Sequence, residues 1–218
     1  MILGIYGAGG LGREVLELAK QINENSNRWK EIVFIDDAEY VSLSRKNIVY
    51  TWEEIIDKFG VNDIEVCIAI GEPAIRAKLA NKINNENYKL ATLIHPSVYI
   101  PDSTKIGQGV IISLNDSISC DITIHNNVYI HPTACIGHDS IIYENTVISS
   151  FVDIAGNCMV GENTYIGLHV CLKEGISVGS ETIVGVSSAV LRDLPDNVIA
   201  LGNPARPMKH NDDKRVFK

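Results

Sequence analysis

An isoleucine stands at every sixth position of residues 118–148, which read ISCDITIHNNVYIHPTACIGHDSIIYENTVI. The same spacing of aliphatic residues continues without a gap from Ile94 to Val190. A second series, two residues before each aliphatic position, carries small or β-branched side chains and is broken only by Asp116. Side chains two positions apart on a strand point to the same side, so each such pair predicts a short strand with two inward groups.

The residues three positions after each aliphatic residue are rich in Gly, Asn and Asp, which tolerate the left-handed backbone angles of a tight corner. They include Gly109, Asn115, Asp121, Asn127, Asp139, Asn145, Asn157, Asn163 and Gly175. A strand and a corner that recur every six residues predict a parallel β-helix, in which each coil covers the edge of the next.

This repeat resembles the hexapeptide-repeat family, whose left-handed β-helix is a three-sided prism with three hexapeptides per coil. The run from Gly202 to Arg206 is similar to the run that follows the last coil in the transferases of that family. The resemblance implies an acyl-CoA-dependent transferase that works as a homotrimer, with active sites between neighbouring prisms. Structural proteins and carbonic anhydrases share the prism, so the fold alone does not fix the reaction.

The first ninety residues predict a small α/β domain with a parallel sheet. A short apolar strand is followed by the loop GAGGLG of residues 7–12 and by apolar residues at helical spacing. Thr51 and Glu54 form a capping box that opens a second helix. The remaining strands are expected at residues 32–35, 66–70 and 90–93, and the helices at residues 51–59 and 73–83.

The glycine loop predicts a phosphate site, because free backbone N–H groups and the helix dipole converge at a helix N-terminus. Gly7, Gly9 and Gly12 fit G-x-G-x-x-G, and Asp36 follows at about the distance of a ribose-binding acid. We reject a dinucleotide, because about ninety residues and four strands form half of a two-nucleotide fold. The alternative, equally open at this stage, is that the glycines only permit a tight strand-to-helix turn.

The two halves together resemble the NeuD/PglD-like family of sugar O- and N-acetyltransferases, typified by UDP-4-amino-sugar N-acetyltransferases. We expect a nucleotide-sugar-binding α/β domain at residues 1–93, a left-handed β-helix acyltransferase domain at 94–195, and a C-terminal turn and tail at 196–218. The resemblance implies that the glycine loop binds the phosphates and that the acidic pair reads the base. The implied substrate-binding residues are Gly7, Gly9, Gly10, Gly12, Asp36, Asp37 and Gly71. Leu11 and the turn Gly71-Glu72-Pro73 depart from the family pattern.

His138 is the candidate base among six histidines. One coil later its place is taken by Gly156, which leaves room beside the imidazole, and one coil earlier by Cys120. The resemblance implies that His138 takes the proton of the attacking group and that Asp139 orients it. The alternative for Asp139 is a purely conformational corner residue. Gly156 is the candidate N–H donor to the oxyanion.

The resemblance also implies acetyl-CoA as co-substrate, held by Gly156, Leu168, Gly185, Asn203, Pro204 and Ala205. Glycines one position after the aliphatic series leave a bare wall on the later coils, and close packing between subunits is an equal alternative for any one of them; they are Gly161, Gly167, Gly179 and Gly185. A second histidine that related enzymes carry after the base corresponds here to Val147. His125 and His131 are expected to point outward from flat faces, and exposed surface is the favoured interpretation of His131.

The composition of the chain excludes several classes of partner. The formal net charge of −8 disfavours nucleic acid, and no apolar run is long enough for a membrane span. Five cysteines without a CxxC pair suit reduced thiols in the cytoplasm and indicate no metal site. We therefore predict acetyl transfer to the amine of a nucleotide-linked amino sugar such as a UDP- or dTDP-4-amino sugar. The alternatives are O-acetylation of sialic acid or another sugar hydroxyl, a zinc carbonic anhydrase, and a non-catalytic sugar-binding scaffold.

Overall fold

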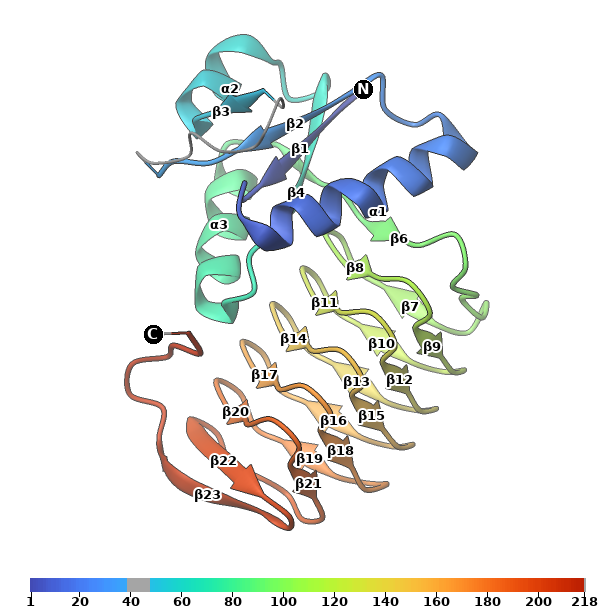
Figure 1. The fold of residues 1–218 in the computed structure, drawn as a ribbon, viewed down its shortest axis with the longest axis vertical. Coiled ribbons are helices and arrows are strands. Elements are labelled where there is room, and N and C mark those ends of the chain that lie inside the picture. Colours follow the sequence, from blue (N-terminus) through green and yellow to red (C-terminus); the bar gives the residue numbers. More distant parts are fainter. Residues whose placement is uncertain (39–47, 218) are drawn as a thin grey trace.

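The computed structural model describes residues 1–38 and 48–217, and its N-terminal part is a five-stranded parallel sheet (Figure 1). The strand order is β3-β2-β1-β4-β5. The capping box of α2 is present as expected: the Thr51 side chain accepts from the Glu54 N–H and the Glu54 carboxylate from the Thr51 N–H. The elements are β1 (Ile2–Tyr6), α1 (Gly10–Ser26), β2 (Glu31–Ile35), β3 (Val49–Tyr50), α2 (Trp52–Lys58), β4 (Ile64–Ile68), α3 (Pro73–Asn85) and β5 (Lys89–Leu90).

The sequence prediction for this sheet is wrong at two places. It does not include β3, because a strand of two residues is too short to show an alternating pattern. It also joined two strands at residues 90–93: β5 pairs with β4 of this sheet, whereas β6 (Leu93–Ile94) pairs with β8 of the prism. The chain therefore passes from one sheet to the other through Ala91 and Thr92 alone.

The second part of the chain is the left-handed β-helix that the repeat predicts. Strands of successive coils pair eighteen residues apart, as Ile124 with Ile142 and Ile130 with Ile148 show. The first face contains β7 (Lys105–Ile106), β10 (Thr123–Ile124), β13 (Ile141–Ile142), β16 (Met159–Val160) and β19 (Ser177–Val178). The second contains β6, β8 (Ile111–Ile112), β11 (Tyr129–Ile130), β14 (Val147–Ile148), β17 (Tyr165–Ile166) and β20 (Ile183–Val184). The third contains β9 (Ser117–Ile118), β12 (Cys135–Ile136), β15 (Asp153–Ile154), β18 (Cys171–Leu172) and β21 (Ala189–Val190).

Three edges join the faces, and each is named here by one of its residues. The Asn127 edge follows the first face and comprises residues 107–109, 125–127, 143–145, 161–163 and 179–181. The Phe151 edge follows the second face and comprises residues 113–115, 131–133, 149–151, 167–169 and 185–187. The His138 edge follows the third face and comprises residues 119–121, 137–139, 155–157 and 173–175.

The third residue of each edge adopts the left-handed conformation that the corner series predicts. Asn127 and Asp139 have φ values of 56° and 57°. Phe151 and Thr133 adopt the same conformation, with φ of 59° and 70°, although bulky and β-branched side chains do not favour it. The coil geometry therefore imposes this conformation at every corner, whichever residue occupies it.

The inside of the prism is filled by the two inward series. The aliphatic series is buried from Ile112 onward and partly buried at Ile94, Ile100 and Ile106, and most of the small series is buried beside it in one cluster. Asp116 is tolerated in this series because its carboxylate accepts the N–H groups of Ser113 at 2.9 Å and Ala134 at 2.8 Å. Burial nevertheless raises the pKa of Asp116 to about 8, against the partial relief from these hydrogen bonds.

The N-terminal domain covers the outer side of the second face. The outward residues Ile111, Tyr129 and Val147 of that face share one apolar cluster with Leu3 and Val15 of the sheet and α1. Figure 1 shows α1 lying across the start of the prism.

Arg76 of α3 bridges the two parts and is fully buried. Its guanidinium donates to the carbonyls of Ile68 at 2.6 Å and Ile70 at 3.1 Å in the N-terminal domain. It also donates to the carbonyl and side-chain oxygens of Asn127 at 2.7 and 2.8 Å. Asn127 begins a ladder of side-chain amides along its edge that continues through Asn145 to Asn163. Burial lowers the pKa of Arg76 to about 10, so the guanidinium stays charged at neutral pH.

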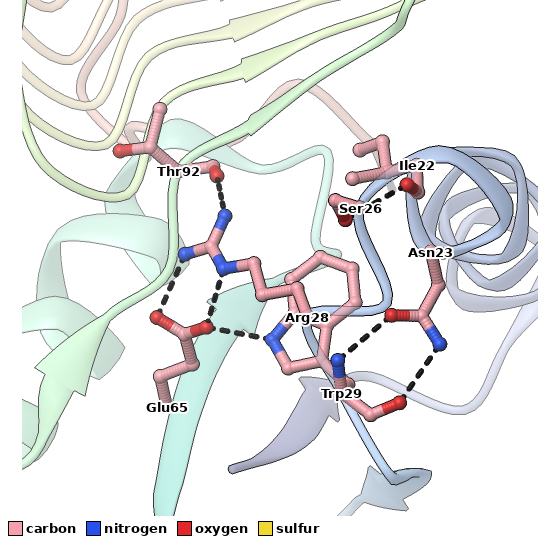
Figure 2. A network of polar contacts seen from close by, with 7 residues as sticks. All are labelled: Ile22, Asn23, Ser26, Arg28, Trp29, Glu65 and Thr92. Atoms are coloured by element: carbon pink, nitrogen blue, oxygen red, sulfur yellow. Dashed lines mark hydrogen bonds and ion pairs between the residues drawn. The ribbon is translucent and has the colours of Figure 1, made fainter.

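A second polar network fixes the segment that leads into the prism (Figure 2). Arg28 binds the Glu65 carboxylate through two nitrogens, both at 2.8 Å, and donates to the Thr92 carbonyl at 3.0 Å. The Trp29 indole also donates to Glu65. The Asn23 side chain holds the Trp29 backbone from the other side, accepting from its N–H and donating to its carbonyl. The crossing at Thr92 is thus tied to both α1 and β4.

The last coil continues into a hairpin of β22 (Val198–Gly202) and β23 (Ala205–His210), and β22 pairs with β20. Beyond it, residues 211–217 return along the prism to the N-terminal half of α3 (Figure 1). Across residues 1–38 and 48–217, no helix combines the length and apolar character that a membrane crossing requires.

Candidate active site

His138 and Asp139 form a hydrogen-bonded pair on the His138 edge. The imidazole Nδ1 lies 2.8 Å from the Asp139 carboxylate, and the two side chains are 50% and 55% exposed. An ionised carboxylate only accepts hydrogen bonds, so this contact places the imidazole hydrogen on Nδ1 and leaves Nε2 as an acceptor. Asp139 forms the corner and also contacts the imidazole.

The stacking arithmetic that pairs His138 with Gly156 agrees with the structure, but the physical reason differs. A Cβ on Gly156 would lie 2.6 Å from both Cε1 and Nε2 of His138. The ring therefore lies against Gly156, and the glycine makes room for the imidazole itself instead of leaving an empty space beside it. Ordinary carbon contacts start at about 3.4 Å, so no larger residue fits here without moving the ring.

The residues expected to hold acetyl-CoA fall on two edges and one turn. Gly156 lies on the His138 edge, whereas Leu168 and Gly185 lie on the Phe151 edge, across the third face. Leu168 is 46% exposed, and Gly185 is covered by the side chain of Leu201. Asn203, Pro204 and Ala205 form the turn between β22 and β23, with a cis bond between the first two.

The glycine loop joins β1 to the N-terminus of α1. Gly7 has a φ of 109°, and a Cβ on Gly12 would overlap the Gly7 carbonyl, so both glycines are required by the turn itself. Gly9 is the N-cap of α1, Gly10 is its first residue, and a Cβ on Gly9 would meet nothing within 4 Å. The turn alone therefore accounts for Gly7 and Gly12, whereas the backbone at Gly9 and Gly10 is open to a ligand such as a phosphate.

Asp36 and Asp37 follow β2 at the same edge of the sheet and already have partners in the chain. Asp36 accepts from the Ala8 N–H in the glycine loop at 2.9 Å. Asp37 accepts from Tyr6 at 2.5 Å, from Lys82 at 2.8 Å and from the first N–H of α2 at 2.8 Å. Burial acts to raise the pKa of Asp37, but the hydrogen bonds from Lys82 and Tyr6 outweigh it and keep this pKa below its ordinary value.

Gly71 lies after β4, on the other side of β1, and has neighbours that the sequence did not reveal. A Cβ there would lie 3.4 Å from the Phe217 ring and 3.7 Å from the Leu11 side chain. Phe217 also packs edge-on against Tyr165 of β17, with ring centroids 5.6 Å apart. Four distant chain segments therefore meet at this point. No local pattern around residue 217 signals this contact.

His131 and His125 are held by contacts within the chain. His131 was expected on exposed surface and is instead largely enclosed, stacked on Tyr129 at 4.2 Å where the N-terminal domain covers the second face. Burial and the nearby positive charge of Arg76 lower its pKa to about 4. His125 stacks on Tyr143 and bonds to Glu144. Val147, at the position of the second family histidine, is buried. Within residues 1–38 and 48–217, no three His, Cys, Asp or Glu side chains converge as a metal ligand set.

An α/β domain followed by a β-helix with a histidine–carboxylate pair is the arrangement from which the sequence analysis predicts an acyltransferase, and comparison with known proteins tests this prediction. Residues 3–83 match the model of the PglD N-terminal domain family. GDP-perosamine N-acetyltransferase of Escherichia coli O157:H7 is 28% identical over 236 aligned positions, which cover 96% of this chain and 97% of the relative. Galactoside O-acetyltransferase of Escherichia coli (strain K12) is 31% identical over 125 positions, 56% of this chain and 62% of the relative.

Among solved structures, the acetyltransferase domain of PglB from Neisseria gonorrhoeae FA1090 in complex with acetyl coenzyme A superposes with a TM-score of 0.87. It is 28% identical, and the match covers 95% of this chain and 98% of that one. The N-terminal part of the chain thus matches the PglD N-terminal domain family, and nearly the whole chain is similar in sequence and fold to sugar acetyltransferases of the NeuD/PglD type. The prediction of an acetyl-CoA-dependent sugar acetyltransferase is confirmed at the level of this class.

Proposed function

We propose that this protein transfers an acetyl group from acetyl-CoA to the amino group of a nucleotide-linked amino sugar, with His138 as the general base. The observation that carries the proposal is the His138–Asp139 contact of 2.8 Å on a half-exposed edge. The relative that spans nearly the whole chain is named for N-acetylation of a GDP-linked sugar, which adds GDP to the candidate nucleotides.

The reaction follows from the free lone pair on Nε2. The amine nitrogen attacks the carbonyl carbon of the thioester, and His138 takes the proton that the nitrogen loses. The C–N bond forms, the C–S bond breaks, and the proton passes to the departing sulfur to give CoA and the amide. Asp139 stabilises the imidazolium that exists between these proton transfers. A backbone N–H at Gly156 is the proposed donor to the oxyanion.

A homotrimer is part of this proposal. Gly156 belongs to the edge after the third face, whereas Leu168 and Gly185 belong to the edge before it. These residues serve one acetyl-CoA if the His138 edge of one prism faces the Phe151 edge of its neighbour. The exposed apolar side chains of Phe151, Leu168 and Val186 suit the Phe151 edge to such an interface.

Transfer to a sugar hydroxyl is the second candidate, because a histidine base serves a hydroxyl as well as an amine and one relative is a galactoside O-acetyltransferase. Thiol release from acetyl-CoA separates the two when GDP-, UDP- and dTDP-amino sugars are compared with CMP-sialic acid, free sialic acid and galactosides. We expect release with a nucleotide amino sugar. Release with the hydroxyl acceptors alone would reassign the reaction, and release with none would reject transferase activity toward these acceptors.

The His138→Ala variant tests the base. We expect loss of about 10²–10⁴ in kcat, the usual contribution of general base catalysis. Its oligomeric state and thermal midpoint should match the wild type because the side chain is half exposed. His125→Ala is the control, since that imidazole lies on another edge and bonds only to Glu144 among the described residues. Full activity of the His138 variant would reject the assignment.

A further inference from the structure

The C-terminal residues of the described chain are held by a buried carboxylate that the proposed chemistry does not use. Glu72 is 6% exposed, and its carboxylate accepts the Val216 N–H at 2.9 and 3.0 Å and the Phe217 N–H at 3.2 Å. Glu72 is also the N-cap residue of α3, yet its side chain makes no capping bond to that helix. With the segment in place this carboxylate is buried, and the two backbone N–H groups supply the hydrogen bonds that a buried carboxylate requires.

A second pair of contacts holds the same segment to the Asn127 edge. Lys214 forms an ion pair of 2.6 Å with Glu181, and the Asn211 side chain donates to the Glu181 carbonyl at 2.8 Å. Terminal residues lose conformational entropy when ordered, about 1–2 kcal/mol of backbone per residue, and are usually left free unless something ties them down. Two separate anchors over seven residues therefore fix where Phe217 lies.

The position of Phe217 follows from the order of the strands. The loops after β2, β1 and β4 lie side by side, because these strands are adjacent in that order. In open parallel sheets, ligands bind beyond the carboxyl ends of the strands, where the chain reverses direction across the sheet, here between β1 and β4. Phe217 lies beside Gly71 and near Leu11, which puts it at the β4 side of this point.

The same order assigns parts of the ligand to parts of the edge. With the phosphates at Gly9 and Gly10 and the base on the side of Asp36 and Asp37, the remaining part of a nucleotide sugar extends to the β4 side. There Phe217, which is 53% exposed, and the partly buried Tyr165 and Leu11 offer apolar surface. Sugar rings present an apolar C–H face that packs well on an aromatic ring.

We infer that Phe217, held in place by Glu72, contacts the hexose of the nucleotide sugar, so the C-terminal segment determines which sugar is accepted. Phe217 is the substrate-contacting residue and Glu72 is a positioning residue that acts through it. The identity of the ligand rests on the proposed function, whereas the docking of the segment does not.

The experiment compares binding of nucleotide hexoses with binding of the free nucleotides. Calorimetry with UDP-N-acetylglucosamine and GDP-mannose, against UDP and GDP, separates the sugar contribution from that of base and phosphates. For Phe217→Ala we expect the Kd of the nucleotide hexose that binds wild type to rise about ten-fold, the scale of one lost ring contact, with the Kd of its free nucleotide unchanged. Met208→Ala, which removes an exposed apolar side chain from β23, is the matched control and should change neither value.

Glu72→Ala tests the anchor, because alanine removes both acceptor oxygens whereas glutamine would keep one. Hydrogen exchange should show the Val216 and Phe217 amides protected in the wild type and exchanging freely in this variant. Its Kd for the nucleotide hexose should rise like that of Phe217→Ala, and the double variant should add nothing, because both changes act through one side chain. Phe217→Tyr keeps the ring and should bind the nucleotide hexose with the wild-type Kd.

Several outcomes overturn the inference. They are equal losses for hexose and free nucleotide, no loss in Phe217→Ala, tighter binding in that variant, binding of none of the four probes, or unprotected amides in the wild type. None of these depends on acetyl transfer. If the protein releases thiol with amino sugars but shows one of these outcomes, the proposed function stands and this inference is rejected. If Phe217→Ala weakens binding of the hexose alone but the protein releases no thiol, this inference stands and the proposed function is rejected.

Discussion

Replacing Gly156 with alanine should impair the proposed base, His138, although His138 itself is unchanged. The added Cβ would lie 2.6 Å from Cε1 and Nε2 of His138, whereas ordinary contact begins near 3.4 Å, so the ring must move by about 0.8 Å. Backbone strain is absent, because Gly156 is not among the residues with positive φ. A reacting group displaced by about 1 Å can lose about 100-fold in rate, so we expect kcat to fall by about 10- to 100-fold.

The assay is thiol release at saturating concentrations of both substrates, with the thermal midpoint as the structural control. The midpoint should move by less than about 3 °C, because a half-exposed ring can swing away at a cost of about 1 kcal/mol or less. The decisive measurement is the double variant with His138→Ala. Without the imidazole there is no clash, so alanine at position 156 should cost nothing further. Wild-type kcat in the single variant, or additive losses in the double variant, would refute the reasoning.

Two further predictions concern stability. Arg76→Met leaves the carbonyls of Ile68, Ile70 and Asn127 without their charged donor. We therefore expect the free energy of unfolding to fall by about 3–5 kcal/mol and the thermal midpoint in calorimetry to fall by about 10 °C. Arg13→Met, which changes an exposed arginine, is the control and should leave both unchanged. The pKa of Asp116 is about 8 in the folded chain, above its ordinary value of 3.8. The contribution of Asp116 to the free energy of unfolding is therefore fully present below pH 3.8 and is lost as the pH rises through 8. Thermal midpoints from pH 5 to 9 should therefore fall more steeply in the wild type than in Asp116→Asn, and parallel curves would contradict the assignment.

The prism could be derived from the sequence because its geometry is local and periodic. Each inward position is set by residues within the same hexapeptide, and the coil-to-coil register follows from three of them, as Ile124 opposite Ile142 shows. The corner conformation at Phe151 and Thr133 could not be derived, because it is imposed by the coil against the preference of the side chains. The division of residues 90–93 between two sheets depends on pairing partners far along the chain and leaves no local pattern.

The same distinction separates the parts of the candidate site. His138 and Gly156 are one coil apart, so counting residues was enough to bring them together. The enclosure of His131 depends on where the N-terminal domain lies against the second face, and hexapeptide spacing carries no information about that. The contact of Phe217 with Gly71 joins residues nearly 150 positions apart through a buried glutamate, beyond the reach of any sequence periodicity.

The cross-section of the prism links the two halves of the proposed reaction. The His138 edge joins the third face to the first, so in a triangle it lies opposite the second face. The second face carries the N-terminal domain, and at Tyr165 it meets Phe217, where the inferred sugar end of the substrate lies. One chain therefore presents its base and its sugar site in opposite directions. With the sugar at that inferred position, one copy does not bring the amine to its own Nε2, so the proposed chemistry requires the His138 edge of a neighbouring copy, which is the arrangement of the proposed homotrimer.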